Sequence, residues 1–169
     1  KAALSPAAAV IVATVRALKM HGGVAKEDLA KENATAVTKG AANLARHIKN
    51  VTSFGVPAIV AINRFVSDTP AEIEAITKAA RENGADAVLC THWSDGGKGC
   101  AELARAVVAL TDKNGAKFRP LYPDDMPLWE KTEAIATKLY GASEIVADTN
   151  VRQRFRELQA GGFGKLPIC

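Results

Sequence analysis

Short apolar runs alternate with longer amphipathic segments along the first two thirds of the chain. Residues 7–15 form an apolar run interrupted only by Thr14, which is typical of a strand buried on both faces of a parallel sheet. Residues 56–62 and 85–90 are two more such runs. The sequence therefore predicts three strands, each followed by a loop and a helix.

Helical spacing follows each of these runs. Apolar residues recur every three or four positions over residues 37–51, after Asn33 as an N-cap. Thr69 and Glu72 form a capping box for a second helix. A third amphipathic helix is expected after the glycine-rich residues 96–99.

Three consecutive strand-loop-helix units predict an α/β fold. We expect a parallel β-sheet with crossover helices on its faces, in a P-loop-NTPase-like or Rossmann-like three-layer arrangement over residues 1–115. Residues 116–169 are expected to form a more helical C-terminal part, with helices at 128–140 and 150–159. The helical spacing predicts three aromatic core positions there: Trp129, Tyr140 and Phe155.

The composition is that of a globular protein without a nucleic-acid or membrane surface. There are 22 Lys and Arg and 18 Asp and Glu, and the net charge of +4 is spread along the chain, so no nucleic-acid partner is expected. The longest wholly apolar run, residues 7–13, is far shorter than the roughly 20 residues that span a bilayer. The three Cys and three His show no metal-ligand spacing, which predicts no metal site, free thiols and a cytoplasmic protein.

Candidate chemistry lies in the loops at the carboxyl ends of the strands, where ligands of open parallel sheets bind. These loops are residues 16–28, 63–68 and 91–98. Phe65 and Trp93 place aromatic rings in two of them. Each ring is either a pin into the core or a stacking platform for a flat ligand.

The same loops hold charged and reactive side chains. Arg16, Lys19 and His21 are either partners for a carboxylate or phosphate or parts of a solvated turn. Cys90 ends an apolar strand, which favours an inert buried thiol over a nucleophile. The glycines of residues 96–99 form neither a Walker A loop nor a dinucleotide-binding fingerprint.

Six stretches of the sequence carry a family resemblance that covers essentially the whole chain. They are TVRALKMHGG from Thr14, FGVPAIVAINRF from Phe54, HWSDGGKG from His92, PLYPDDMPLWEK from Pro120, YGA from Tyr140 and the final GFGKLPIC. In this order they resemble formate–tetrahydrofolate ligase (10-formyltetrahydrofolate synthetase). The resemblance implies a reaction in which formate attacks the terminal phosphoryl of ATP to give formyl phosphate, and N10 of tetrahydrofolate then takes the formyl group.

The resemblance also implies site residues, cofactors and partners. Phe65 and Trp93 would stack on the pterin of tetrahydrofolate, while no catalytic residue is identified. Arg16, Lys19 and His21 would face the phosphate or formyl end. The same cleft would be lined by Asn63, Leu89, Cys90 and Thr91. Family members use ATP with Mg²⁺ and an activating monovalent cation (K⁺ or NH₄⁺), and they are typically homotetramers.

The chain also departs from the family. It has no Walker A loop, it stops after LPIC before the MAKT-type segment that normally follows, and it has Val-Ser-Asp-Thr after Phe65 where many relatives have proline and threonine. We therefore expect a central or C-terminal fragment that supplies the folate side of a longer ligase, is inactive alone and has the rest of its own chain as a partner. The alternative is a noncatalytic α/β module for packing or oligomerisation that binds no ligand by itself.

Overall fold

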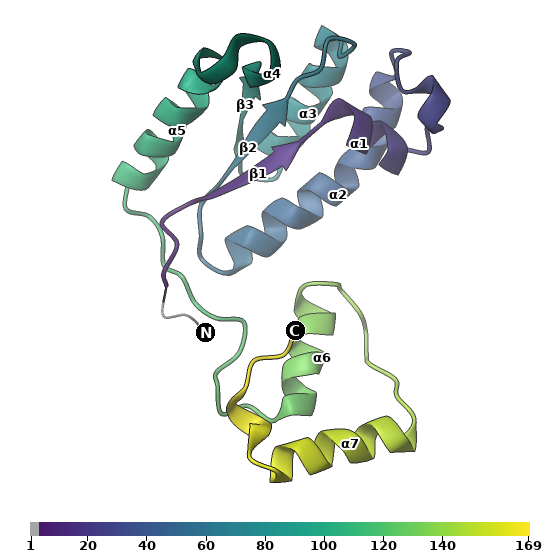
Figure 1. Cartoon of the computed structure of the whole chain (residues 1–169), viewed down its shortest axis with the longest axis vertical. Helices are drawn as coiled ribbons and strands as arrows, with labels where there is room; N and C mark the ends of the chain where they lie inside the picture. The colour runs from purple at the N-terminus through teal and green to yellow at the C-terminus, as the bar shows by residue number, and fades with distance from the viewer. Residues whose placement is uncertain (1–3) are drawn as a thin grey trace. The chain divides into compact units, whose positions relative to one another are not determined.

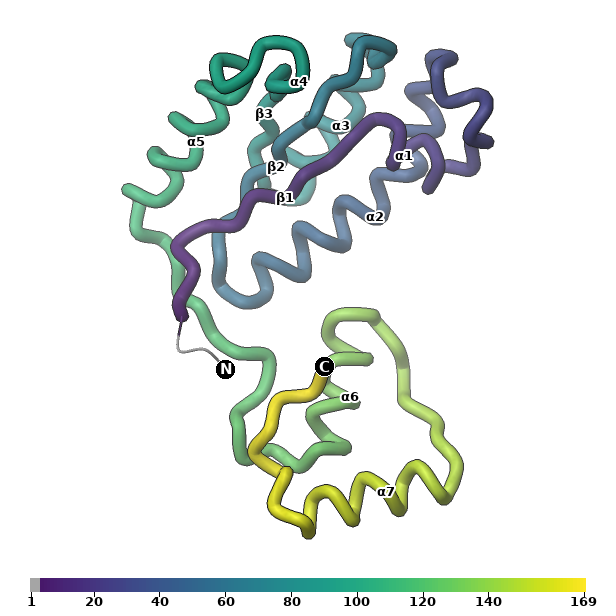
Figure 2. The backbone as a smooth tube through the Cα atoms, viewed as in Figure 1, coloured from purple at the N-terminus to yellow at the C-terminus, as the bar shows by residue number. Residues whose placement is uncertain are grey.

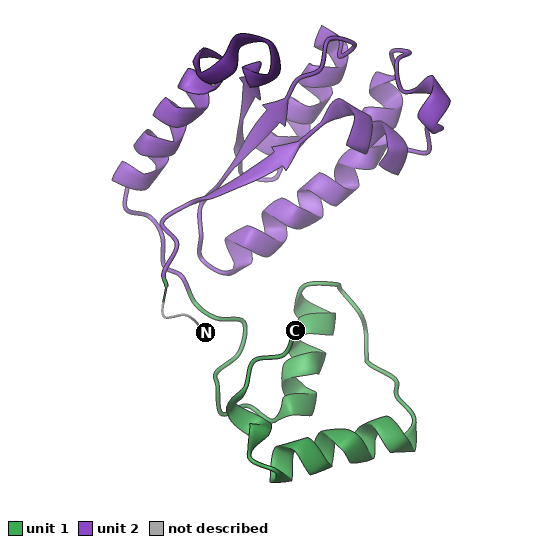
Figure 3. Cartoon of the chain, viewed as in Figure 1, with its two compact units in different colours: residues 1–4, 119–169 green, residues 5–118 purple. Residues whose placement is uncertain are grey.

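The computed structural model describes residues 4–169 (Figures 1 and 2). These residues divide into two compact units (Figure 3). One unit is Ser5–Phe118, and the other is Arg119–Cys169 together with Leu4. The sequence predicts a change from α/β to more helical structure between residues 115 and 116.

A three-stranded parallel sheet forms the centre of the Ser5–Phe118 unit. Its strands are β1 (Ala9–Ala13), β2 (Ala58–Asn63) and β3 (Asp86–Cys90), in the spatial order β1-β2-β3. The register pairs Ala13 with Ile62 and Asn63 with Cys90. All three strands therefore present their carboxyl ends at the same edge of the sheet, as the sequence predicted.

Helices cover both faces of this sheet and confirm the three-layer α/β fold. The helices are α1 (Val15–His21), α2 (Ala34–Ser53), α3 (Pro70–Glu82), α4 (His92–Asp95) and α5 (Ala101–Asp112), with short 3₁₀ turns η1 (Lys26–Asp28) and η2 (Gly96–Cys100). On one face, Val60 and Ile62 pack in the main core cluster with the apolar stripes of α2 and α3. On the other face, α5 lies over Ile59 and Val88. The predicted caps are present, since Asn33 accepts a hydrogen bond from the Ala36 N–H and the Thr69 capping box is complete.

Strand β1 differs from its prediction. Residues 7–15 were expected to form a strand buried on both faces, but the strand is limited to Ala9–Ala13. Val10 and Val12 are 44% and 67% exposed on one face, while Ile11 packs against the core on the other. The prediction of burial on both faces is therefore wrong, because no helix among the described residues covers the face of β1 that carries Val10 and Val12.

Helix α1 replaces about the first half of the predicted loop of residues 16–28. Its start is stabilised by Thr14, whose hydroxyl accepts a hydrogen bond from the Ala17 N–H at 3.1 Å. The helix packs closely on α2, because a Cβ atom at Gly40 would collide with the Leu18 carbonyl. Only the second half of the predicted loop remains irregular, around η1.

The Arg119–Cys169 unit contains two helices and a short turn. These are α6 (Leu128–Lys138), α7 (Thr149–Ala160) and the 3₁₀ turn η3 (Phe163–Lys165). Trp129 and Phe155 pack edge to face with ring centroids 5.4 Å apart, so these two predicted core positions do contact each other. Tyr140 is 78% exposed, and its predicted core position is wrong because α6 ends at Lys138.

A buried lysine fastens the end of this unit to α6. The ammonium of Lys131 is fully buried and donates hydrogen bonds to the carbonyl oxygens of Asp124, Gly164 and Leu166, at 2.8, 2.6 and 3.0 Å. These three bonds use the full donor capacity of a lysine side chain. Lys131 therefore holds the turn after α7 in a fixed place against α6.

Candidate functional site

The carboxyl edge of the sheet brings two ring-bearing loops together. One loop follows β2 and carries Phe65, and the other follows β3 and carries Trp93 on α4. Both rings line one cavity of about 190 Å³, together with Arg64, Val66, Thr91 and Ser94. Trp93 is 74% exposed, so it is not a pin into the core. An exposed indole beside a cavity is a suitable platform for a flat ligand.

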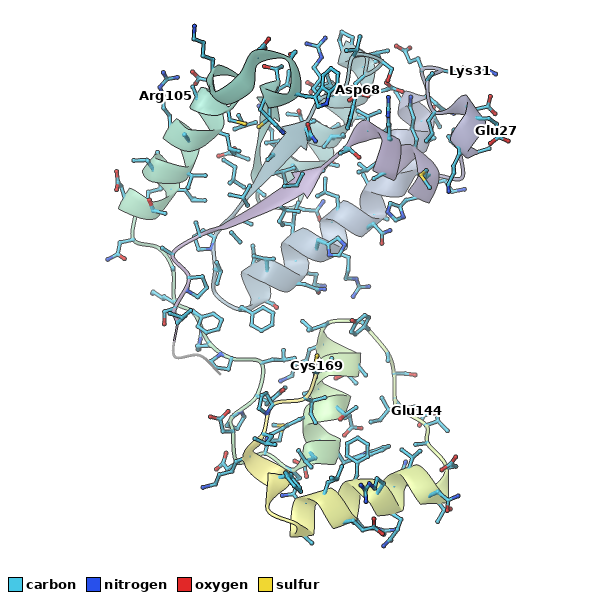
Figure 4. All side chains as sticks on the ribbon, viewed as in Figure 1. Glu27, Lys31, Asp68, Arg105, Glu144 and Cys169 are labelled. Carbon is cyan, nitrogen blue, oxygen red and sulfur yellow. The ribbon has the colours of Figure 1, made fainter. Side chains whose placement is uncertain are left out.

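Asp68 holds the loop that carries Phe65. Its buried carboxylate accepts a hydrogen bond from the Phe65 N–H at 2.8 Å, and the Asp68 N–H donates to the Phe65 carbonyl at 3.0 Å. The loop is also tied to β3, since the Arg64 N–H donates to the Cys90 carbonyl at 3.0 Å. Asp68 is labelled at the upper edge of the sheet in Figure 4. These three hydrogen bonds fix the position of Phe65 in the absence of a ligand.

Arg16 covers one face of the Phe65 ring. Its guanidinium carbon lies 4.5 Å from the ring centroid, a cation–π contact between α1 and the loop after β2. Arg16 was expected to face an anionic part of a substrate. The structure places it in contact with one of the two rings that line the cavity.

The loop that carries Trp93 is closed at its base. The Thr91 N–H donates to the Gly99 carbonyl at 3.0 Å, and a Cβ atom at Gly99 would collide with the Thr91 backbone. Within the loop, hydrogen bonds from the side chains of Thr91 and then Ser94 lower the pKa of Asp95. Asp95 therefore carries its negative charge close to the cavity at neutral pH.

Cys90 and Leu89 lie on opposite faces of β3. The Cys90 side chain is buried, and its thiol donates a weak hydrogen bond to the Val88 carbonyl at 3.8 Å. Burial, followed by the hydrogen bond and charge of Cys100, raises the pKa of the Cys90 thiol to about 11. A thiol with such a pKa is almost entirely protonated at neutral pH, which fits the inert thiol that the sequence favours. Leu89 is 38% exposed on the sheet face of Ile62.

Lys19 lies inside the protein. Its side chain is 1% exposed. Its ammonium lies 2.5 Å from the Glu72 carboxylate and donates to the carbonyls of Leu29 and Lys31 at 2.9 and 2.8 Å. These three partners leave Lys19 no donor for a phosphate or formyl group. The capping box indicates that Glu72 has a structural role, but the pairing with Lys19 does not follow from local sequence because Glu72 lies on a different helix.

Glu72 is the centre of a buried polar network. Its carboxylate also accepts hydrogen bonds from the backbone N–H groups of Asn33 and Thr69, at 2.8 and 3.0 Å. Burial alone would raise the pKa of Glu72, but the hydrogen bond from Lys19, those from the two N–H groups and the Lys19 charge lower it overall. The network joins α1, α2 and α3 at the edge of the sheet that carries the cavity.

The remaining predicted site residues take separate positions. The Nδ1 atom of His21 lies 2.7 Å from the Asn43 side-chain nitrogen, at the surface between α1 and α2. The Asn63 Oδ1 atom is buried and has no hydrogen-bond partner among residues 4–169. Asn63 ends β2 directly before the loop that holds Phe65, whereas His21 is not among the residues that line the cavity.

Within residues 4–169, no group of three or more His, Cys, Asp or Glu side chains is arranged to hold a metal ion. The chain also has no Walker A loop that would hold the phosphates of ATP. In the same part of the chain, no helix combines the length and hydropathy of a membrane span.

The whole chain matches known proteins of one kind. The family described as formate–tetrahydrofolate ligase matches residues 1–169. The chain is 58% identical to a formate–tetrahydrofolate ligase of Granulibacter bethesdensis, 57% to one of Rhizobium rhizogenes and 59% to one of Sinorhizobium medicae. Each match covers 100% of this chain and 30% of the relative, so the chain spans about a third of the length of these curated relatives. The chain belongs to the formate–tetrahydrofolate ligase family.

Proposed function

We propose that the cavity between Phe65 and Trp93 binds the pterin ring of tetrahydrofolate. The chain would then supply the folate side of a longer ATP-dependent ligase that makes 10-formyltetrahydrofolate. The observation that carries this proposal is that both loop aromatics line one cavity in a chain of this family. Two aromatic side chains bind a flat heterocycle with little loss of conformational entropy, because each has only two rotatable bonds.

The size of the cavity supports a ring rather than a whole folate. Its volume of about 190 Å³ is below the roughly 300–1,000 Å³ of pockets that enclose a drug-sized ligand. The pterin would lie against the rings while the rest of the folate extends outward. Arg64 is the cation among the residues that line the cavity, and it would lie beside the extending part.

In the proposed reaction this chain binds and orients one substrate. Formyl phosphate would form from formate and ATP elsewhere in the longer protein, and N10 of the bound folate would attack its formyl carbon with release of phosphate. ATP with Mg²⁺ would be held mainly by residues outside this chain, which has no Walker A loop, and a monovalent cation would activate the enzyme. The rings contribute by holding N10 in one position, which lowers the entropic part of the barrier. A homo-oligomeric, cytoplasmic enzyme is part of the same proposal.

A noncatalytic packing module is the second candidate. The observation that favours it is the exposed pair Val10 and Val12 on β1, an apolar surface that another polypeptide could cover. This candidate predicts that removing Phe65 or Trp93 changes no substrate affinity. The two functions therefore differ in a measurable quantity.

The first test replaces Trp93 by Ala in the longer ligase. We expect the KM for tetrahydrofolate to rise about tenfold or more, since a stacked ring contributes on the order of 1–3 kcal/mol. The KM values for ATP and formate should stay unchanged. Trp93→Phe, which keeps an aromatic face, should retain most of the affinity for tetrahydrofolate. An unchanged KM for tetrahydrofolate in Trp93→Ala would refute the proposed pterin site.

A further inference from the structure

A second cavity lies between the first turn of α6 and the last two turns of α7. Its volume is about 380 Å³, within the roughly 300–1,000 Å³ range of small-molecule sites. Its apolar part is formed by Leu128, Trp129, Phe155 and Ala160. It shares no residue with the cavity of Phe65 and Trp93, and the proposed function makes no use of it.

The walls of this cavity are fixed within the Arg119–Cys169 unit. Trp129 and Phe155 hold each other edge to face at 5.4 Å. The Gln159 side-chain oxygen accepts a hydrogen bond from the Leu128 N–H at 2.9 Å, which ties α7 to the start of α6. Lys131 fastens α6 to the turn that follows α7. The cavity is therefore formed before any ligand binds.

Two arginines of α7 give the cavity a positive charge. Arg152 and Arg156 are one helical turn apart and line it together. The Arg152 guanidinium lies 4.3 Å from the centroid of the Trp129 ring. Within residues 4–169, neither side chain has a carboxylate at salt-bridge distance.

A third arginine of the same helix provides a contrast. Arg154 does not line the cavity and pairs with Glu157 at 3.2 Å. The arginines of α7 thus divide into one that is neutralised by its own helix and two that face an apolar cavity without a counter-charge. Guanidinium groups in such a position bind carboxylate or phosphate oxygens in a bidentate manner.

We propose that this cavity binds a flat, apolar ring that carries an oxyanion. The ring lies against Trp129 and Phe155, and the carboxylate or phosphate accepts hydrogen bonds from Arg152 and Arg156. The ligand needs both its ring and its oxyanion. Burial of the ring against the apolar surface provides affinity, and the two arginines select an anion over a neutral compound.

Calorimetric titration of the full chain tests this site with defined probes. The anionic probes are 2-naphthoate and 2-naphthyl phosphate, and 2-naphthamide is the neutral compound of nearly the same shape. We expect both anions to bind with sub-millimolar Kd and the amide to bind at least tenfold more weakly. The anion that binds more tightly identifies whether the natural ligand is a carboxylate or a phosphate. Equal binding of the amide, or no binding of either anion, would overturn the proposal.

Variants locate the binding site. Arg156→Gln should weaken the tighter anion at least fivefold, and the double variant Arg152→Gln/Arg156→Gln should abolish detectable binding. Arg154→Gln is the matched control, with the same change on the same helix, and should bind as the unchanged chain does. Trp93→Ala should also leave anion binding unchanged, which separates this site from the proposed pterin site. Unchanged binding in Arg156→Gln, whose side chain is exposed and whose loss leaves the fold intact, would exclude the site.

Discussion

At the scale of single residues, the environment of Cys90 makes the stability of the folded chain depend on pH. Burial, with the contact to Cys100, raises the thiol pKa from 9.0 to about 11 in the folded protein. The folded state therefore keeps this proton more tightly than the unfolded state does. By linkage, the stabilisation from the protonated thiol is complete below pH 9 and is lost as the pH rises from 9 to 11.

This gives a prediction for the free energy of unfolding. Between pH 9 and pH 11, under reducing conditions, the free energy of unfolding should fall more steeply for the unchanged chain than for Cys90→Ala. Urea unfolding curves at pH 8, 9, 10 and 11 measure the two slopes. Cys169→Ala, which changes an exposed thiol, serves as the control and should retain the steep slope. Parallel slopes for the unchanged chain and Cys90→Ala would contradict the assigned environment.

The sequence predicts the positions of some site residues but not the burial or the contacts of others. The positions of Phe65 and Trp93 on loops at one sheet edge follow from their place after predicted strands. The burial of Lys19 does not follow from local sequence, because its partner Glu72 lies on a different helix. The surroundings of a charged side chain depend on the element that carries its partner, so they cannot be predicted from the neighbouring residues alone. The contact between Arg16 and Phe65 is a second example, because it joins α1 to the loop after β2.

At the scale of elements, the Lys19–Glu72 pair connects the last turn of α1 with the starts of α2 and α3. Glu72 is bound by Lys19 of α1, by the N-cap residue Asn33 of α2 and by the N-cap residue Thr69 of its own helix α3. The loop with Phe65 ends at the same capping box. Removing the ammonium would leave a buried carboxylate without its counter-charge.

We therefore predict that Lys19→Met destabilises the chain by about 3–5 kcal/mol, the range found when one partner of a buried pair is removed. The exposed pair of Lys78 and Glu82 on α3 is the matched comparison, and Lys78→Met should cost less than about 1 kcal/mol. Urea unfolding at pH 7 gives both values. Because the pKa of Glu72 is lowered in the folded state, the contribution of the pair should be present at neutral pH and disappear as acid protonates this carboxylate. Equal effects of the two substitutions would contradict the described network.

A helix or strand can be predicted from the sequence when its own residues carry its caps and its apolar spacing. Helices α2 and α3 have caps and long apolar stripes in the sequence, and both begin where predicted. Helix α1 has seven residues directly after a strand, too few to show a helical period, and it was expected to be a loop. The exposure of Val12 was missed for another reason, since an apolar run shows that a strand forms but does not show whether its outer face is covered.

At the scale of the whole molecule, the chain combines a sheet-based unit and a helical unit, each with its own buried residues. The fold class of the first unit was predictable because repeated strand-loop-helix units leave few arrangements open. The second unit lacks such a repeat, and two of the three carbonyl groups that bind the Lys131 ammonium, those of Gly164 and Leu166, are distant in sequence. The family and the cavity together support the proposal that this chain binds the pterin of a folate.

Calorimetric titration of the 169-residue chain with tetrahydrofolate, in the absence of oxygen, tests that claim most directly. We expect one binding site with a micromolar Kd, loss of binding in Phe65→Ala and Trp93→Ala, and unchanged binding in Trp129→Phe. A folded chain that gives no heat of binding, or that binds tetrahydrofolate equally well without either ring, would contradict the account and support the packing module instead.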